Sequence, residues 1–325
     1  MRCGIQILLT GCAGFIGSQL AQRLLSLGYS VVGLDAIDET LYSAALHRQQ
    51  LAPLLNQPNF RFVEGDILSM ELLSALTKEA SAVIHLAALA GVRPSLSQAA
   101  RYLRCNVEGT QNVLHACQQH GVRRIVFASS SSVYGAHSAV PFREDDAAIR
   151  PASPYAASKR AGELICSAHA DLYGASIAAL RFFTVYGPQQ RPEMAIASFA
   201  ARILRGEPVT LHGSGDSARD YTYIDDIIDG TVAALHRTSD SQLGFRAYNL
   251  GGERTATLRE LVSLLESSLG RSAQVQWRPD QPGDVPITWA SLDRSRHELG
   301  YAPKVDLPQG IARYCAWLTA PRPTP

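Results

Sequence analysis

The sequence predicts an α/β protein in which a doubly wound parallel sheet is followed by a smaller C-terminal α/β domain. Short β-branched runs alternate with helix-compatible stretches through the first half, and a glycine-rich turn follows the first apolar run. This alternation favours parallel strands joined by right-handed crossover helices. We expect residues 1–183 to form the first domain and 184–320 mainly the second, with a discontinuous boundary and a tail at 321–325.

The strands of the first domain are predicted from short runs rich in β-branched and other apolar residues. Parallel strands covered on both faces show such continuous apolar runs rather than strict alternation. The predicted strands cover residues 5–10, 29–35, 60–66, 81–88, 122–129 and 175–183.

The helices are predicted from apolar residues that recur at helical spacing. The longest such stretch is 95–120, where an apolar stripe includes Val113, Leu114 and Cys117. The other predicted helices lie near residues 14–28, 154–173, 194–205, 224–237 and 257–269.

Composition excludes several classes of function. The 325-residue chain is 46% hydrophobic and 18% charged, with a formal net charge of +1. That charge predicts neither a nucleic-acid partner nor an anionic membrane partner. The apolar run at 5–9 is too short for a membrane span, and we expect no signal peptide. The six scattered cysteines are interpreted as reduced thiols in a cytoplasmic protein, and no Cys/His cluster predicts a metal site.

A phosphate-binding loop is predicted at TGCAGFIG (10–17), where Gly11, Gly14 and Gly17 mark the turn from the first strand to the first helix. Glycine lets the backbone turn sharply and come close to a pyrophosphate. The helix N-terminus then offers unpaired N–H groups to the anion. A glycine-rich turn without a ligand is the alternative interpretation.

Two aspartates follow the next strands. Asp35 ends the second strand, 18 residues after Gly17, where a carboxylate accepts hydrogen bonds from both adenosine ribose hydroxyls and repels a 2′-phosphate. NAD is therefore the expected cofactor, rather than NADP. Asp66, after the third strand, is interpreted either as an adenine contact or as a solvated turn residue.

A tyrosine and a lysine share one helix face in SPYAASK (153–159), because Tyr155 and Lys159 stand at i and i+4. A free phenol has a pKa of about 10 and is a poor base near neutrality. A nearby ammonium group favours the phenolate. Tyr155 is thus a candidate proton acceptor for a hydroxyl whose carbon loses hydride, and Lys159 a candidate anchor for the nicotinamide ribose.

These motifs give the chain a resemblance to the extended short-chain dehydrogenase/reductase family, within it to the sugar-nucleotide epimerases and dehydratases. The resemblance covers nearly the whole chain. It implies a Rossmann-type first domain that binds NAD. It rests on TGCAGFIG, HLAA (85–88), NVEGTQNVLHAC (106–117), SSSSVYG (129–135), SPYAASK, RFFTVYGP (181–188), RDYTYIDD (219–226) and PGDVP (282–286).

The resemblance also implies roles for single residues. Ser130 matches the family hydroxyl that hydrogen-bonds the reacting group beside Tyr155 and Lys159. Asn106 matches an asparagine near the active-site helix, although a core polar residue is an equal interpretation. Relatives commonly form dimers through helices that correspond to 95–120 and 154–173, so a homodimer is expected. The implied cofactor contacts are Gly11, Gly14, Phe15, Ile16, Gly17, Asp35, Asp66, Ile67, Leu86, Ala87, Ala88, Tyr155 and Lys159.

The serine row, Ser129 to Ser132, narrows the range of reactions that the resemblance allows. Relatives that dehydrate a 4-keto sugar carry an acid and a base at the two positions after the catalytic hydroxyl, and decarboxylating relatives usually keep a glutamate at the second. Here these positions are Ser131 and Ser132, neither of which is a general base near pH 7. Oxidation at C4 and return of the hydride to the other face remain, which is epimerisation. The alternative is that the serines are strand-end turn residues.

The substrate is suggested by RFFTVYGPQQRPEM (181–194), which is similar to UDP-glucuronate 4-epimerases, as are AGVRPS (90–95) and SARDYTYIDD (217–226). A hexuronate needs an anion site, and Arg191 with the hydroxyls of Thr184, Ser131 and Ser132 is the candidate. Such a site would also oppose loss of CO₂ from the β-keto acid intermediate. Alternatively, Arg191 lies in a surface loop and binds phosphate or solvent.

Four further positions complete the candidate set. Arg219 matches an arginine that pairs with the nucleotide pyrophosphate, with a surface ion pair to a neighbouring aspartate as the alternative. Arg93 is a candidate contact for the sugar or the pyrophosphate. Gln281 stands where several relatives carry a phosphate-binding arginine, a departure that weakens this contact. His85 is interpreted as a packed core histidine.

The sequence thus predicts an NAD-dependent UDP-sugar 4-epimerase, with UDP-glucuronate as the favoured substrate. A 4-epimerase for UDP-glucose or UDP-N-acetylglucosamine, and a UDP-glucuronate decarboxylase, are the enzyme alternatives. A non-catalytic nucleotide-sensing protein that binds NAD is an alternative from another class, and the intact Ser130, Tyr155 and Lys159 argue against it.

Overall fold

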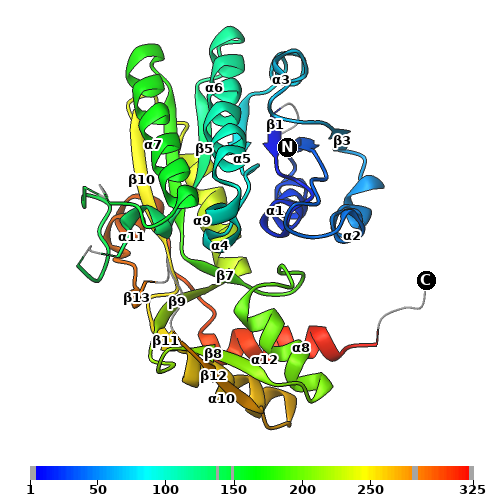
Figure 1. Cartoon of the computed structure of the whole chain (residues 1–325). Helices are drawn as coiled ribbons and strands as arrows, with labels where there is room; N and C mark the ends of the chain where they lie inside the picture. Colours follow the sequence, from blue (N-terminus) through cyan, green and yellow to red (C-terminus); the bar gives the residue numbers. More distant parts are fainter. Residues whose placement is uncertain (1–4, 137–138, 148–149, 280–284, 322–325) are drawn as a thin grey trace.

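The central element of the fold is a parallel seven-stranded sheet (Figure 1). The computed structural model describes residues 5–136, 139–147, 150–279 and 285–321. The strand order is β10-β6-β5-β4-β1-β2-β3, so the order reverses between β1 and β4. The strands are β1 (Gln6–Thr10), β2 (Ser30–Asp35), β3 (Phe60–Glu64), β4 (Ala82–His85), β5 (Arg124–Ser130), β6 (Ser176–Phe182) and β10 (Phe245–Leu250).

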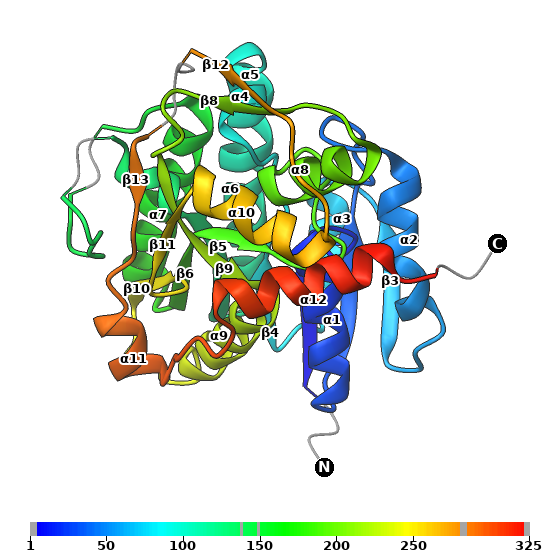
Figure 2. The ribbon, with the colours of Figure 1, turned by 90° about the horizontal axis from the view of Figure 1, so that it is seen from below.

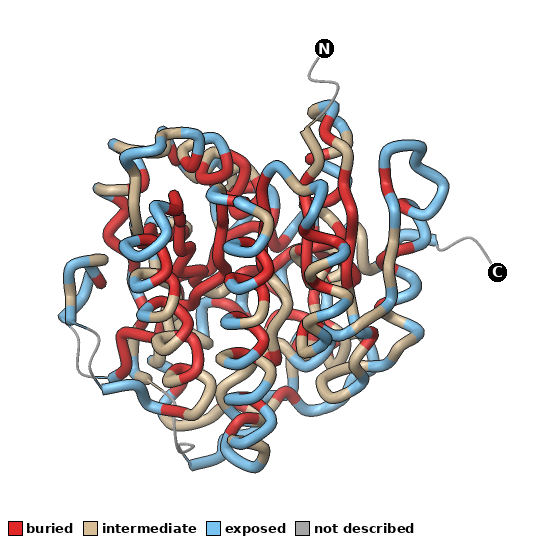
Figure 3. Tube along the Cα trace, turned by 90° about the horizontal axis from the view of Figure 1, so that it is seen from above, coloured by how far each residue is buried: buried red, intermediate tan, exposed pale blue. Residues whose placement is uncertain are grey.

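Two layers of helices cover the sheet, as the sequence predicted for a doubly wound protein. One face packs on α1 (Phe15–Ser26), α2 (Ala44–Leu55) and α9 (Ile224–Arg237). The other packs on α3 (Met70–Thr77), α6 (Gly109–Gln119) and α7 (Pro154–Tyr173). Every residue of β6 is buried, which explains why these strands read as continuous apolar runs. The buried strands form the centre of the molecule in Figure 3.

The remaining strands form a smaller layer beyond the carboxyl ends of the sheet. Strands β7 (Thr184–Tyr186), β9 (Ala218–Tyr223), β11 (Thr255–Thr257) and β13 (Ile287–Thr288) pair with one another, and β8 (Val209–His212) pairs with β12 (Val275–Arg278). Figure 2 shows the helices of this region, seen from below. They are α8 (Ala195–Arg205), α10 (Leu258–Leu269) and α12 (Leu307–Thr319), whereas α11 (Asp293–Leu299) packs on α9 and β10 of the large sheet.

The predicted long helix at 95–120 is wrong as a single element. The structure divides the segment into α4 (Val92–Ser97), α5 (Ala99–Leu103), a π-helical turn at Arg104–Glu108 and α6. Gln98 has φ −129° and ψ 33°, which ends α4. In the π-helical turn, Asn106 exchanges hydrogen bonds with the backbone of Leu89 at 2.8 and 2.9 Å. Such tertiary contacts compete with regular helix geometry, and apolar periodicity in the sequence does not predict them.

The helix predicted at 154–173 is confirmed to the residue by α7. Ser153 caps its N-terminus by accepting a hydrogen bond from the Ala156 N–H, Pro154 occupies the first turn, and Gly174 ends it in the left-handed conformation. The structure adds four helices that the periodicity did not single out, α2, α3, α11 and α12. Among the described residues, no helix is long and apolar enough to cross a membrane.

Candidate active site

A cleft lies along the carboxyl ends of the strands, where the strand order reverses. Such switch points are the usual ligand sites of open α/β sheets. The cleft consists of two cavities of about 460 and 340 Å³ that share residues of the glycine loop. The larger cavity is lined by α7, by the end of β5 and by residues of the smaller layer, and the smaller one by the ends of β2, β3 and β4.

The glycine loop joins β1 to α1 as predicted. Gly11 has φ +77° and its N–H donates to the Leu34 carbonyl at 2.8 Å, which holds the loop against β2. A Cβ on Gly17 would lie 2.0 Å from the Gly11 carbonyl oxygen, so the close approach of helix and loop requires glycine there. Gly14 lines both cavities and starts α1 without a side-chain cap. The first N–H groups of α1 can therefore serve a bound phosphate.

Asp35 lies at the end of β2 and lines the smaller cavity together with Asp66 and Ile67. Its two carboxylate oxygens accept hydrogen bonds from the N–H groups of Ala13 and Ile37, each at 2.9 Å. Burial raises the pKa of Asp35 above its ordinary value, and these two bonds counter the rise. A carboxylate has about four acceptor positions, so Asp35 retains capacity for a ribose diol. The loop and this acceptor fit NAD.

Asp66 is a turn residue that also lines the smaller cavity, and its contact with the adenine stays a prediction. Its Oδ1 accepts a hydrogen bond from the Leu68 N–H at 2.9 Å, which makes it a turn residue, and it also lines the cavity beside Ile67. The adjacent predicted contacts Leu86, Ala87 and Ala88 line the same wall.

Tyr155 and Lys159 extend from α7 into the larger cavity, beside Ser130 at the end of β5. Lys159 is buried, and its Nζ donates to the Ala128 carbonyl at 2.8 Å. Burial lowers the pKa of Lys159 to about 8. Burial also raises the pKa of Tyr155, while a hydrogen bond with Ser130 and the charge of Arg191 lower it.

Ser130 and Arg191 are thus protein groups that favour the Tyr155 phenolate. The expected contribution of the Lys159 ammonium group stays a prediction, and in the structure its Nζ donates to the strand backbone. The positive charge of an oxidised nicotinamide ring is a further source of stabilisation for a phenolate.

All four serines at 129–132 contribute to the lining of the larger cavity. Ser130 accepts a hydrogen bond from the Ser132 N–H at 3.1 Å and so caps a 3₁₀ turn at Ser131–Tyr134, and this turn role leaves the proposed ligand role of the serines open as a prediction. The Ser129 hydroxyl donates to the buried carboxylate of Glu163 at 2.6 Å.

The candidate anion site lies at the same end of the cavity, where Thr184 and Arg191 contribute to the lining. The Arg191 side chain is mostly buried, with 19% exposed, which argues against an arginine that only contacts solvent. Its Nη1 donates to the Ala90 carbonyl at 3.4 Å and lies 3.3 Å from a Glu193 carboxylate oxygen.

The remaining candidates are Arg219, Arg93 and Gln281, and the first two differ in whether they line a cavity. Arg219 lines the cavity, and its Nη1 donates to the Ala218 carbonyl at 2.9 Å. Arg93, on α4, is exposed and is not among the residues that line the two cavities, so its contact with the sugar or the pyrophosphate stays a prediction. Gln281 lies outside the described residues.

Two buried polar residues, His85 and Asn106, form hydrogen bonds with the elements that carry the site. His85 accepts or donates hydrogen bonds at both ring nitrogens, to Thr10 at 2.7 Å and Thr110 at 3.1 Å, which agrees with a packed core histidine. Burial lowers the pKa of His85 to about 3, so its ring is neutral. Asn106 donates to Ser158 on α7 at 2.9 Å and is itself buried, as its core interpretation required.

Sequence reasoning missed Tyr42. It lines both cavities and stacks on His47, with ring centroids 4.2 Å apart. No motif marks Tyr42, and only its position shortly after β2 could have indicated it. Met194 of the larger cavity was likewise not assigned, although it belongs to a quoted motif.

The doubly wound sheet, the glycine loop and the Ser–Tyr–Lys group together define a dinucleotide-dependent enzyme that acts on a hydroxyl-bearing substrate. A family profile matches residues 7–251. The chain belongs to the NAD dependent epimerase/dehydratase family.

Individual relatives are similar over nearly the whole chain. The UDP-glucuronate 4-epimerase of Thermodesulfobacterium geofontis is 38% identical over 313 residues, 95% of both chains. The crystal structure of the Bacillus cereus UDP-glucuronic acid 4-epimerase with UDP-glucuronic acid and NAD has a TM-score of 0.89 at 36% identity, over 97% of this chain and 99% of that one. The dTDP-glucose 4,6-dehydratase DesIV of Streptomyces venezuelae reaches 0.88 at 33% identity, over 96% of each.

The similarity to a dehydratase shows that the fold alone does not select the reaction. The side chains of the cavity have to do so.

Proposed function

We propose that this protein is an NAD-dependent UDP-sugar 4-epimerase that interconverts UDP-glucuronate and UDP-galacturonate through a transient 4-keto intermediate. The observation that carries the proposal is the chemistry of the larger cavity. Its lining contains Ser130, Tyr155, Lys159 and Arg191, and none of the described residues that line it is an aspartate or a glutamate. The site therefore has the groups for reversible oxidation at C4 and lacks the carboxylates of a dehydratase.

Tyr155 is the proton acceptor and donor. Its phenolic oxygen takes the C4 hydroxyl proton and later returns it, and Ser130 hydrogen-bonds the same hydroxyl and orients it. Lys159 is proposed to hold the nicotinamide ribose, because it follows Tyr155 by one turn on α7 and lines the same cavity. When bound, NAD accepts hydride from C4 and returns it to the opposite face of the sugar.

Arg191 is proposed to bind the C6 carboxylate, with Thr184, Ser131 and Ser132 as hydroxyl donors. A guanidinium group matches carboxylate geometry, and a partly buried one binds more strongly than an exposed one. The 4-keto form of a hexuronate is a β-keto acid that loses CO₂ readily. Decarboxylation requires the carboxylate to give up its charge, so a firm ion pair with Arg191 opposes it.

The test is a proton NMR time course of the purified protein with UDP-glucuronate and no added reductant. We expect UDP-galacturonate to accumulate to an equilibrium mixture. Formation of a UDP-pentose with CO₂ would identify a decarboxylase instead. Conversion of UDP-glucose or UDP-N-acetylglucosamine without conversion of UDP-glucuronate would contradict the proposed substrate.

The working unit is proposed to be a homodimer in the cytoplasm. Apolar side chains stand exposed on α5 and α7, namely Leu103, Leu164, Leu172 and Tyr173. Exposed apolar groups that gather on adjacent helices are typical of a contact surface between subunits. The cysteines in the described residues are free thiols, which supports a reducing compartment. The cavity and the net charge support a nucleotide-sugar ligand rather than nucleic acid.

A further inference from the structure

Ser129 is the member of the serine row for which the proposed reaction provides no role. It is buried near the end of β5, one residue before Ser130. Its neighbour Phe127 packs in the core between the sheet and α7, and Ser129 points to the same side of the strand. There its hydroxyl donates to Oε1 of Glu163 at 2.6 Å.

Glu163 is a fully buried carboxylate that collects three donors besides Ser129. Arg181 donates through Nε at 2.8 Å and Nη2 at 2.9 Å, and Arg160 donates through Nη1 at 2.8 Å. Burial raises the pKa of Glu163, but the bonds and charge of Arg181, together with the bonds from Ser129 and Arg160, outweigh burial and hold this pKa below its ordinary value. Glu163 is therefore charged, and its bidentate bond to Arg181 fixes both side chains in one geometry.

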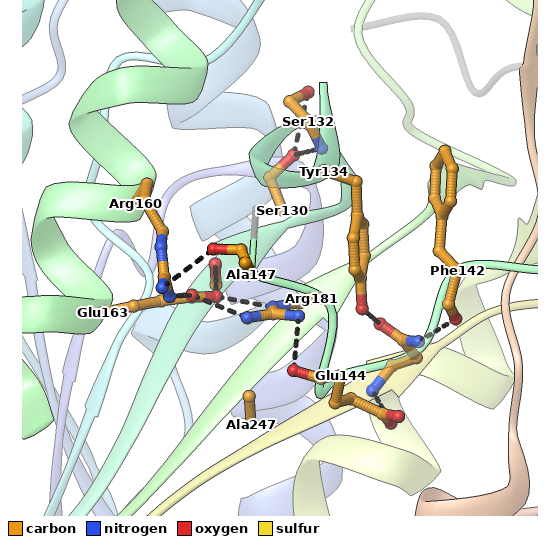
Figure 4. A network of polar contacts seen from close by, with 12 residues as sticks. Ser130, Ser132, Tyr134, Phe142, Glu144, Ala147, Arg160, Glu163, Arg181 and Ala247 are labelled. Carbon is orange, nitrogen blue, oxygen red and sulfur yellow. Dashed lines mark hydrogen bonds and ion pairs between the residues drawn. The ribbon is translucent and has the colours of Figure 1, made fainter. Parts of the chain in front are cut away.

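Arg181 extends the network from the helix to the turn that follows the serine row. Its Nη1 donates to the Glu144 carbonyl at 3.2 Å, and its guanidinium lies 4.7 Å from the centre of the Tyr134 ring. Tyr134 closes the 3₁₀ turn that begins at Ser131, and its hydroxyl donates to Asn249 Oδ1 at 2.7 Å. Figure 4 shows this chain of contacts from Glu163 to the far side of Tyr134.

The network lies directly behind the catalytic pair. Lys159 and Glu163 follow Tyr155 on α7 by one and two turns. Both are bonded to residues 128–129 of β5, while Ser130 is the next residue of that strand. The distance between Ser130 and Tyr155 is thus set by bonds between the strand and the helix that carry them.

We propose that Ser129, Glu163 and Arg181 are positioning residues that hold the catalytic helix in register with the serine row. The inference rests on the proposed role of Tyr155 as the proton acceptor. A hydrogen bond with Ser130 is among the interactions that lower the pKa of Tyr155. If the network loosens, this bond lengthens and the phenolate becomes harder to form.

The main test is the double substitution Glu163→Met/Arg181→Met. Replacing a buried ion pair by apolar side chains of similar size often preserves stability, and a methionine packs well on the Tyr134 ring. We expect an unchanged fold, a kcat lowered roughly tenfold or more, and a KM within about twofold of the original protein. Ser129→Ala keeps the ion pair and removes one bond, so it should give a smaller loss of kcat in the same direction.

A readout that does not depend on turnover is the titration of Tyr155 itself. In holoenzyme labelled with ¹³C at tyrosine Cζ, Tyr155→Phe assigns the signal, and its chemical shift reports the phenol–phenolate equilibrium. We expect both variants to move the midpoint to higher pH, by roughly half a unit or more. Arg160→Met is the matched control, because it removes the partly exposed partner of Glu163 and leaves Arg181 and Ser129 in place. It should titrate like the unmodified protein.

Two results separate the inference from the proposed function. If the double variant and Ser129→Ala both keep the original kcat and the original Tyr155 midpoint, the positioning inference is wrong. If the unmodified protein fails to convert UDP-glucuronate, the proposed substrate is wrong, while the titration still decides whether the network positions Tyr155.

Discussion

The Nζ atom of Lys159 donates a hydrogen bond to the carbonyl oxygen of Ala128, 2.8 Å away, on the strand that ends in the serine row. This bond holds the lysine in the sheet–helix interface, where it is almost fully buried. An ammonium group in such a place has lost most of its hydration, and a single carbonyl does not replace it. Lys159 therefore lines the site but lowers the free energy of unfolding of the protein.

That cost predicts the stability of a Lys159→Met variant. Burial lowers the pKa of Lys159 to about 8 in the folded state, from 10.5. The penalty for the charged form is fully present below pH 8 and disappears as the pH rises to 10.5, where the unfolded chain also loses the proton. Lys159→Met should therefore raise the free energy of unfolding of the NAD-free protein at pH 7, by about 1 kcal/mol after loss of the bond to Ala128.

Urea unfolding at pH 7 and pH 10 measures this effect, and the gain should shrink at the higher pH. The exposed Lys78 supplies a control, since Lys78→Met removes a solvated ammonium group. A Lys159→Met protein that is less stable than the original at pH 7 would contradict the argument.

Arg191→Ala should weaken the binding of UDP-glucuronate far more than that of UDP-glucose. The two ligands differ at C6, where the carboxylate of the first is proposed to meet the guanidinium group. A hydrogen bond to a charged group contributes roughly 1.5–3 kcal/mol, so the expected loss for UDP-glucuronate is about 10- to 100-fold. Isothermal titration calorimetry of the holoenzyme with each ligand measures both affinities.

Glu193→Gln is the companion variant, because it removes the carboxylate 3.3 Å from Arg191 and leaves the arginine in place. It should retain or strengthen the binding of UDP-glucuronate. Equal losses for both ligands in Arg191→Ala would mean that Arg191 binds a part common to them, such as the pyrophosphate.

Asp35→Asn should change the choice between NAD and NADP. Asp35 carries the carboxylate at the end of β2, and its charge repels a 2′-phosphate. The amide removes that charge and retains one oxygen acceptor for the Ala13 or Ile37 N–H. We expect NAD affinity to fall roughly tenfold while NADP affinity falls less or rises.

Fluorescence titration of the NAD-free protein with both dinucleotides gives the ratio of affinities. Asp38→Asn removes another carboxylate from the same cavity, one that already pairs with Arg101 at 2.6 Å. The ratio should therefore change less in Asp38→Asn. A larger change of this ratio in Asp38→Asn than in Asp35→Asn would mean that Asp38 discriminates between NAD and NADP.

Leu164→Asp should dissociate the proposed dimer. Leu164 lies on α7 with 57% of its surface exposed, and a charge at the centre of an apolar contact has to be desolvated without a partner. Leu55→Asp is a matched control, because Leu55 on α2 is 55% exposed and outside the proposed contact surface. Sedimentation velocity should show a monomer for the first variant and a dimer for the second. The same mass for both would assign the contact to another surface.

The parts of the site that follow strands and glycine turns were predictable, because their signals are local. Gly11, Asp35 and Ser130 each stand at a strand end that the sequence marks by an apolar run. The limits of α7 were predictable for the same reason, since its cap, its first-turn proline and its terminal glycine are all in the sequence.

Contacts between distant segments were not predictable in this way. The π-helical turn around Asn106 depends on Leu89, the hydrogen bonds of His85 depend on Thr10 and Thr110, and the neutral state of its ring depends on burial. Arg93 was assigned to the site from its neighbourhood in a motif, and that motif did not indicate that its side chain would be exposed and absent from the cavity lining.

The position of β10 late in the sequence determines which part of the chain can form the complete sheet. It pairs in parallel with β6 along Phe245–Leu250 and completes the sheet only after the chain has passed through the smaller layer. A fragment that stopped at residue 183 would leave the wholly buried β6 as an open edge, which invites aggregation. We therefore expect that the cofactor-binding half cannot be excised at residue 183 as an independent module, and that its sheet is complete only once the chain has been synthesised through Leu250.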